Sequence, residues 1–264
     1  MGVPSRPPSF RRSVCAVADD DGKRKAFRST RGTAFGGIQQ TFDDVWWAWG
    51  TTKFMPGAMI PRNMTIVREG EDLVVIHPVL LPDAMQKEVE ALGEVKHIVR
   101  LGDFHGMDDK LYVERYAPTV WAPPGATPRD GVKVDHELKG GDELPLKDAT
   151  LIDFTESLAP ETVLHAPRHG GIIFTCDSVQ NHGTKAPGTT FLGGLMMKVM
   201  GMKGPACIGR GWVKFCQPKE GPGFGPKFRE LLELEFRHMM PAHGLPLKEV
   251  ARDELRKSVS ELYG

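Results

Sequence analysis

From about residue 41 onward, apolar residues recur with the spacings that strands and helices require. Two β-rich runs within residues 63–79 surround a Glu69-Gly70-Glu71 turn, which is typical of a β-hairpin. Alternating or continuous apolar runs predict further strands at 95–101, 119–124, 149–154, 161–167 and 170–179. Apolar residues at helical spacing predict helices at 81–93, 108–117, 225–236 and 247–264. Hairpins and β-α-β units therefore alternate along the chain, which indicates the α/β class.

Two of these helices carry signals for their ends and faces. Asp83 is expected to cap the first helix, and Gly93 to end it. The buried face of the last helix is expected to consist of Val250, Leu255, Val259 and Leu262.

The first 40 residues differ from the rest of the chain. They are rich in arginine and serine and poor in apolar side chains, so we expect a flexible tail at 1–40 and one domain at 41–264. The tail lacks the apolar core of a secretory signal. A cytoplasmic location is expected, with organelle import directed by the basic tail as the alternative.

Composition and charge exclude several classes of protein. The 264 residues are 40% hydrophobic and 26% charged, which is ordinary for a soluble globular protein. Lysine plus arginine equals aspartate plus glutamate at 34 each, so nothing favours nucleic acid as a partner. The four cysteines have no CxxC spacing, and no apolar run is long enough for a membrane span.

Polar groups able to bind a metal follow several predicted strands. Ligands of open α/β sheets lie beyond the carboxyl ends of the strands, so distant residues can converge there. The candidates are Asp103, His105, Asp108, Glu156, Asp177 and His243. Histidine nitrogens and carboxylate oxygens suit zinc, iron or manganese. Each residue also has a simpler interpretation as a turn, cap or loop residue, and Cys176 is expected to point away from Asp177 as inert packing.

An ordered set of segments resembles the metallo-β-lactamase fold over residues 63–244. The segments are MTIVREGEDLVVIHPV, LGEVKHIVRLGDFHGMDD, APTVWAPPG, GGIIFTCDSVQN and MMPAHGLP. They resemble the opening hairpin, the strand before the His-x-His-x-Asp-His motif, the strand after the motif helix, the strand ending in a metal-bridging aspartate, and the late strand with the last histidine. The resemblance implies an αββα four-layer sandwich with two mixed β-sheets flanked by helices.

The resemblance also implies which site residues are kept. Aligned from Asp103, the motif keeps its second histidine as His105, whereas Asp103, Met107 and Asp108 replace its first histidine, its aspartate and its last histidine. An alignment starting at His105 instead keeps Asp109 as the aspartate but loses both later histidines. Asp177 and His243 match directly.

A third histidine is expected near 155–165, where Glu156 and His165 are both candidates. A single zinc, iron or manganese ion is therefore expected, held by His105, Asp177, His243 and one of Asp103 or Asp108.

The expected function is that of a hydrolase-like protein with a reduced metal site. A metal-bound water would attack an ester, thioester or phosphoester, with Asp108 or Glu156 accepting a proton in place of the missing aspartate. The alternative is a non-catalytic descendant that binds no metal and uses the same pocket for a small molecule or a partner. The oligomeric state is not predicted.

Two apolar segments have several interpretations. Trp46, Trp47 and Trp49 form either part of the core, which is preferred, or the wall of a pocket. Residues 189–213 are rich in methionine and glycine, and they are expected to pack in the fold, to cover the site as a lid, to form a dimer contact or to touch a membrane surface.

Overall fold

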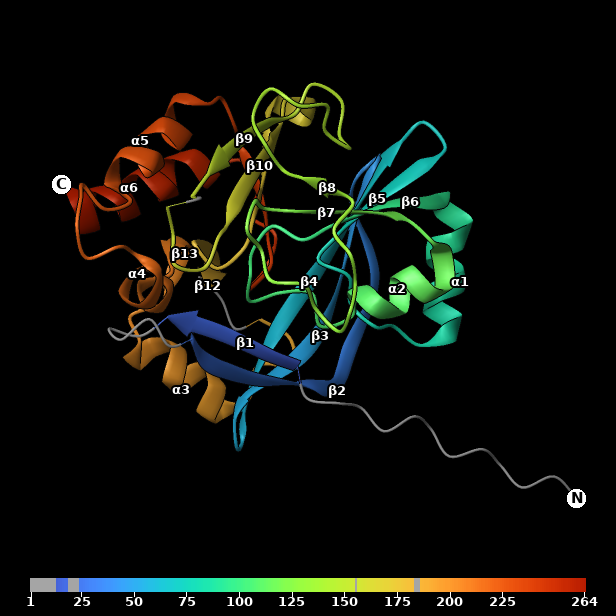
Figure 1. Ribbon diagram of the computed structural model, residues 1–264, viewed down its shortest axis with the longest axis horizontal. Helices are drawn as coiled ribbons and strands as arrows, with labels where there is room; N and C mark the ends of the chain where they lie inside the picture. The colour runs from blue at the N-terminus through green and yellow to red at the C-terminus, as the bar shows by residue number, and fades with distance from the viewer. Residues whose placement is uncertain (1–12, 19–23, 155, 183–185) are drawn as a thin grey trace, which may run out of the picture.

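Two β-sheets pack face to face, and helices cover both outer sides (Figure 1). The computed structural model describes the backbone of residues 13–18, 24–154, 156–182 and 186–264, with side chains from residue 32 onward within those ranges. The large sheet has the spatial order β1 (Ser13–Ala18), β2 (Arg24–Phe42), β3 (Val45–Met55), β4 (Ala58–Glu69), β5 (Asp72–Ile76), β6 (Glu94–Val99), β7 (Thr119–Ala122) and β8 (His136–Glu137). Strands β5 to β8 pair in parallel and the others antiparallel, so the sheet is mixed.

The second sheet is also mixed and is formed by residues that lie later in the chain. Its order is β14 (His238–Pro241), β11 (Ile172–Thr175), β10 (Thr162–Ala166) and β9 (Thr150–Asp153). Strand β14 pairs with β11 in parallel, which brings the carboxyl ends of both strands to the same edge. A separate two-stranded sheet joins β12 (Val179–His182) to β13 (Gly204–Ile208).

The helices fall into two groups on the outer sides and one segment at the periphery (Figure 1). Their bounds are α1 (Asp83–Leu92), α2 (Asp109–Tyr116), α3 (Phe191–Val199), α4 (Arg210–Cys216), α5 (Gly225–Glu233) and α6 (Ala251–Tyr263), with a short 3-10 turn η1 (Arg168–Gly170). No helix of the described residues is long and apolar enough to cross a membrane.

Three buried clusters define the four layers. One cluster packs α1 and α2 on the outer face of the large sheet through residues such as Val89, Tyr112 and Ile98. The central cluster joins the inner faces of the two sheets, and the third packs α4, α5 and α6 on the outer face of the second sheet. The order helix, sheet, sheet, helix agrees with the predicted αββα sandwich.

The strand β3 shows how the alternating pattern builds these layers. Neighbouring side chains of a strand point to opposite faces, so Trp46 joins the outer cluster and Trp47 the central one. Both are less than 10% exposed, and burying 150–250 Å² of each ring contributes roughly 4–6 kcal/mol before entropy is subtracted. The preferred core interpretation of these tryptophans is confirmed, and Trp49 packs against the same core while partly exposed.

The structure corrects several details of the sequence analysis. Asp83 is the first residue of α1 rather than its cap, because Pro82 occupies the cap position and no side chain accepts a hydrogen bond there. Val250 precedes α6 and is exposed, whereas Leu255 and Val259 are buried as predicted. Strands β1 and β2 already belong to the large sheet, so its strands begin at Ser13, inside the predicted tail; residues 1–12 and 19–23 lie outside the described residues.

Candidate metal centre

Three residues that are far apart in the sequence meet where strands of both sheets end. His105 lies in the loop after β6, Asp177 follows β11, and His243 follows β14. Their ligand atoms all lie within 4.8 Å of one another. The parallel pairing of β11 and β14 places Asp177 and His243 at one edge, and Thr175 accepts a backbone hydrogen bond from Ala242 just before them. The structure therefore brings together His105, Asp177 and His243, the three ligands that the sequence analysis named without an alternative.

The spacing of these atoms is compatible with ligands of a single ion. Nε2 of His105 lies 3.5 Å from Oδ2 of Asp177, and Nε2 of His243 lies 3.3 Å from Oδ1. Charge-assisted N–H···O bonds are usually about 2.7–2.9 Å long. Two ligand atoms each about 2.1 Å from a tetrahedral ion are roughly 3.4 Å apart. Two nitrogens and a carboxylate at this separation fit zinc, iron or manganese.

Strand β4 fixes the position of His243. Nδ1 of His243 lies 2.8 Å from the Pro61 carbonyl oxygen, to which it donates, so Nε2 is left to face Asp177. The Asn63 side chain donates to the carbonyl oxygens of Pro241 and Gly244, at 2.8 and 2.7 Å. Gly244 has a φ of 93°, and a Cβ there would lie 1.7 Å from a backbone oxygen, so this turn requires glycine.

A buried carboxylate holds the backbone of the Asp177 turn. Glu161 is 1% exposed and accepts hydrogen bonds from the backbone N–H groups of Asp177 (3.1 Å) and Ser178 (2.7 Å). Burial, together with the charge of Asp177, raises the pKa of Glu161 to about 8. Glu161 is not among the predicted ligands because it begins a predicted strand, whereas the predicted ligands follow strands.

Burial and neighbouring charges shift the pKa values of the cluster in opposite directions. Burial alone would raise the pKa of Asp177, but His105 and His243 outweigh burial and hold that pKa far below its usual range. Burial lowers the pKa of His105, so its imidazole is neutral and keeps a lone pair. Burial also disfavours the charged form of His243, but Asp177 dominates and raises the pKa of His243.

The two other aspartates predicted as ligands hold the loop instead. Oδ1 of Asp103 accepts from the backbone N–H of Thr127 at 2.6 Å, and the Asp103 carbonyl oxygen accepts from Arg129. Asp108 is fully buried, forms an ion pair with Arg62 and accepts from the Leu80 backbone N–H at 2.7 Å. Neither belongs to any group of closely spaced ligand atoms in the described part of the chain.

Glu156 and His165, the two candidates for a third ligand, also lie outside the cluster. Glu156 is exposed on the connection between β9 and β10. Nε2 of His165 lies 2.9 Å from the Glu235 carbonyl oxygen, on the side of β10 toward the end of α5. The structure thus does not place Asp108 or Glu156, the proposed proton acceptors, beside His105 and Asp177.

Two residues that the sequence analysis did not assign to the site extend the cluster. His77 follows β5 directly, and its ligand atom lies within 4.8 Å of those of His105 and Cys176. The rule that found His105 could have found His77, since His77 directly follows the apolar run of residues 73–76. Cys176 does not point away from Asp177, because β11 ends at Thr175 and strand alternation stops there; its Sγ lies 3.8 Å from Oδ2 of Asp177.

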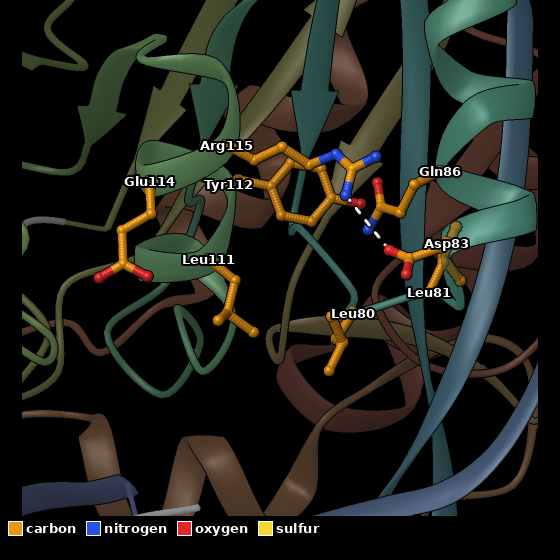
Figure 2. A pocket seen from close by; sticks show the side chains of 8 residues that line it. All are labelled: Leu80, Leu81, Asp83, Gln86, Leu111, Tyr112, Glu114 and Arg115. Carbon is orange, nitrogen blue, oxygen red and sulfur yellow. Dashed lines mark hydrogen bonds and ion pairs between the residues drawn. The ribbon is translucent and has the colours of Figure 1, made fainter. Parts of the chain in front are cut away.

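A shallow surface pocket lies apart from this cluster. It measures about 250 Å³ and is lined by side chains of α1, α2 and the segment before α1: Leu80, Leu81, Asp83, Gln86, Leu111, Tyr112, Glu114 and Arg115. Figure 2 shows Arg115 reaching across it to Asp83, at 3.3 Å. Its lining includes none of the candidate ligands, so we do not assign the chemistry to it.

Comparison with known proteins identifies the fold. No protein-family model matches this sequence, and no curated protein sequence does. Solved structures match at low identity. A metallo-β-lactamase from Erythrobacter litoralis is 13% identical with a TM-score of 0.54, covering 88% of this chain and 96% of that one. The metallo-β-lactamase FIM-1 from Pseudomonas aeruginosa, in its mono-zinc form, is 11% identical with a TM-score of 0.56, covering 88% and 97%.

A metallo-β-lactamase from Pontibacter korlensis is 14% identical with a TM-score of 0.54, covering 84% of this chain and 98% of its own. Nearly the whole length of each of these structures is matched. Together with the two mixed sheets and the flanking helices, these matches show that this chain has the metallo-β-lactamase fold.

Proposed function

We propose that this protein is a metal-dependent hydrolase in which His105, Asp177 and His243 hold one ion. The observation that supports the proposal is the convergence of these three side chains from three separate strand ends. Their separations of 3.5 and 3.3 Å suit shared ligation. The substrate is proposed to be an ester, a thioester or a phosphoester.

The ligand set is compatible with zinc, iron or manganese. When bound, such an ion supplies Lewis acidity and lowers the pKa of water toward neutrality. The protein contributes the orientation of the donors. The Pro61 carbonyl oxygen accepts from Nδ1 of His243, and Glu161 accepts from the Asp177 backbone N–H. Both contacts restrict the ligands to one arrangement, which lowers the cost of assembling the site.

A second candidate function is binding without catalysis. Met107 stands where the resemblance places the catalytic aspartate, and the neighbouring Asp108 is paired with Arg62. In the alignment from Asp103, the loop therefore offers no carboxylate at the position of the motif aspartate to accept a proton from water. A protein of this kind binds a small molecule at the same strand ends without turning it over.

One experiment separates the two functions. The protein is stripped with a chelator, loaded with zinc, iron(II) or manganese(II), and assayed with nitrophenyl esters, a thioester and a nitrophenyl phosphodiester. Metal-dependent turnover that is lost in Asp177→Asn supports the hydrolase. The matched control is Asp253→Asn, an exposed acid in α6, which should behave like wild type. Absence of turnover with every substrate, whether or not metal is bound, would favour the second function.

A further inference from the structure

His77 is an unusual residue for the position it occupies. It is 5% exposed, and neither nitrogen of its ring has a hydrogen-bond partner among the described residues. Buried imidazoles are normally hydrogen-bonded, so such a residue needs an explanation. Its backbone is also in the left-handed region, with a φ of 55°, which residues other than glycine rarely adopt and which is often found at functional sites.

The surroundings of His77 supply further donor atoms. Its ring lies 4.5 Å from the ring of His105, centroid to centroid. The backbone N–H of His77 donates to the Val99 carbonyl oxygen at 2.8 Å, which fixes the strand end that carries the ring. One ligand atom each of His77, His105 and Cys176 lie within 4.8 Å of one another. This donor group shares His105 with the group formed by His105, Asp177 and His243.

We propose that His77 and Cys176 join His105 in binding the metal, so that the centre draws a nitrogen and a sulfur ligand from outside the metallo-β-lactamase motif. The inference rests on the proposed metal-dependent function. When Sγ of Cys176 bonds to the metal, the thiol proton passes to water. A ligand set with imidazole and thiolate favours zinc over manganese, because soft sulfur ligands suit zinc and the harder oxygen ligands suit manganese.

The test uses cobalt(II) as a spectroscopic substitute for zinc in the full chain. Wild-type protein titrated with cobalt should show a thiolate-to-metal charge-transfer band in the near ultraviolet. Cys176→Ala should lose this band and keep the weaker visible bands. His77→Asn should weaken cobalt binding by about tenfold or more. Asparagine tolerates the left-handed backbone, so this variant is expected to fold.

Matched controls separate a failure of this ligand assignment from a failure of the proposed metal-dependent function. Cys207→Ala removes another buried thiol, on β13, and should keep the charge-transfer band. Cobalt binding without a charge-transfer band, or with unchanged affinity in His77→Asn, overturns the assignment of these ligands and leaves the proposed function standing. Failure of the wild type to bind either cobalt or zinc overturns both.

A separate surface of α3 carries an independent inference. Phe191 and Val199 are 86% and 79% exposed, and Leu192 and Leu195 are also exposed. The opposite side of α3 is packed, since Met197 contacts Ile60 of β4. The turn between β3 and β4 lies beside the helix, where the Thr190 hydroxyl donates to the Gly57 carbonyl oxygen at 2.8 Å. We call Phe191, Leu192, Leu195, Val199 and the exposed Met55 the α3 surface.

Only basic charges accompany these apolar side chains in the sequence. No acidic residue occurs between Asp177 and Glu220, or between Asp44 and Glu69. Lys53, Lys198 and Lys203 are exposed next to the α3 surface in the chain. Large exposed apolar side chains mark interaction sites, and basic neighbours add attraction to anionic lipid headgroups.

We infer that the α3 surface binds the surface of an anionic lipid bilayer. Flotation with vesicles of phosphatidylglycerol and phosphatidylcholine, compared with phosphatidylcholine alone, tests this. Protein should float with the anionic vesicles, and Phe191→Asp with Val199→Asp should abolish flotation. Val250→Asp, at another exposed apolar position, before α6, should leave it unchanged.

Protein that stays at the bottom with anionic vesicles overturns the bilayer assignment. So does a lipid-free dimer, detected by analytical ultracentrifugation, that dissociates in the Phe191→Asp variant. That result would identify a second copy of the chain as the occupant of the α3 surface.

Discussion

Removing the Asp108 carboxylate tests whether the acids of the loop after β6 hold the fold or a metal. Asp108 is fully buried, pairs with Arg62, which is 7% exposed, and accepts from the Leu80 backbone N–H. Asp108→Ala leaves the arginine charge buried without this partner, a change that typically costs about 3–5 kcal/mol. The Leu80 backbone N–H also loses its acceptor, but the two costs share one site, so the total is less than the sum of two separate losses. Against a total stability of roughly 5–15 kcal/mol, the loss is large.

The assay is urea unfolding of the metal-free protein at neutral pH, beside metal content after loading. Asp108→Asn should cost less than Asp108→Ala, because its amide oxygen still accepts from Leu80, and it should bind as much metal as wild type. Asp253→Ala removes the exposed Asp253–Arg256 pair of α6 and should change the free energy of unfolding by less than about 0.5 kcal/mol. The reasoning is refuted if Asp108→Asn unfolds like wild type yet loses its metal.

The remaining predictions concern the supports of the site and one pH effect. Gly244→Ala should lower the free energy of unfolding by more than about 3 kcal/mol in urea titrations and weaken zinc binding, because its Cβ would lie 1.7 Å from a backbone oxygen; wild-type values would contradict the geometry of that turn. Asn63→Ala removes two side-chain hydrogen bonds and should cost about 2 kcal/mol in the same assay, whereas no change would show that these bonds do not hold the turn. Burial raises the pKa of Asp44, but the contacts with His169 and Arg168 outweigh burial and lower the pKa below its ordinary value of 3.8. Asp44→Asn should therefore be less stable than wild type by about 0.5–1 kcal/mol near pH 6, and the difference should shrink as the pH falls below 3.8; a difference that grows on acidification would contradict that sign.

The fold could be predicted from the sequence because it follows from the periodicity of single segments and from the order of these segments along the chain. Strand and helix periods located β5, β6, α2 and β11, and the polar residues after them followed from the rule for strand ends. His105, Asp177 and His243 were found for that reason. Their convergence depends on the parallel pairing of β11 with β14, which no local pattern reveals.

The functions of the acids could not be read from the sequence. Asp103 and Asp108 resemble ligands because they flank His105, but their partners, Thr127 and Arg62, are supplied by distant segments. Burial and long-range pairing decide whether a carboxylate binds a metal or an arginine, and both are properties of the folded chain. His77 directly follows an apolar run, so the sequence could have placed it among the candidates, but the lack of a hydrogen-bond partner for its ring is a property of the folded chain.

The central claim is that His105 and His243 share a metal. The most direct test is the metal content of purified protein by elemental mass spectrometry, for wild type beside His105→Ala and His243→Ala. His165→Ala serves as the matched control, since its ring contacts the Glu235 carbonyl oxygen away from the cluster. We predict about one equivalent of metal in wild type and in the control, and its loss in both site variants. Full metal content in both site variants, or none in wild type after loading with zinc, iron and manganese, would contradict the claim.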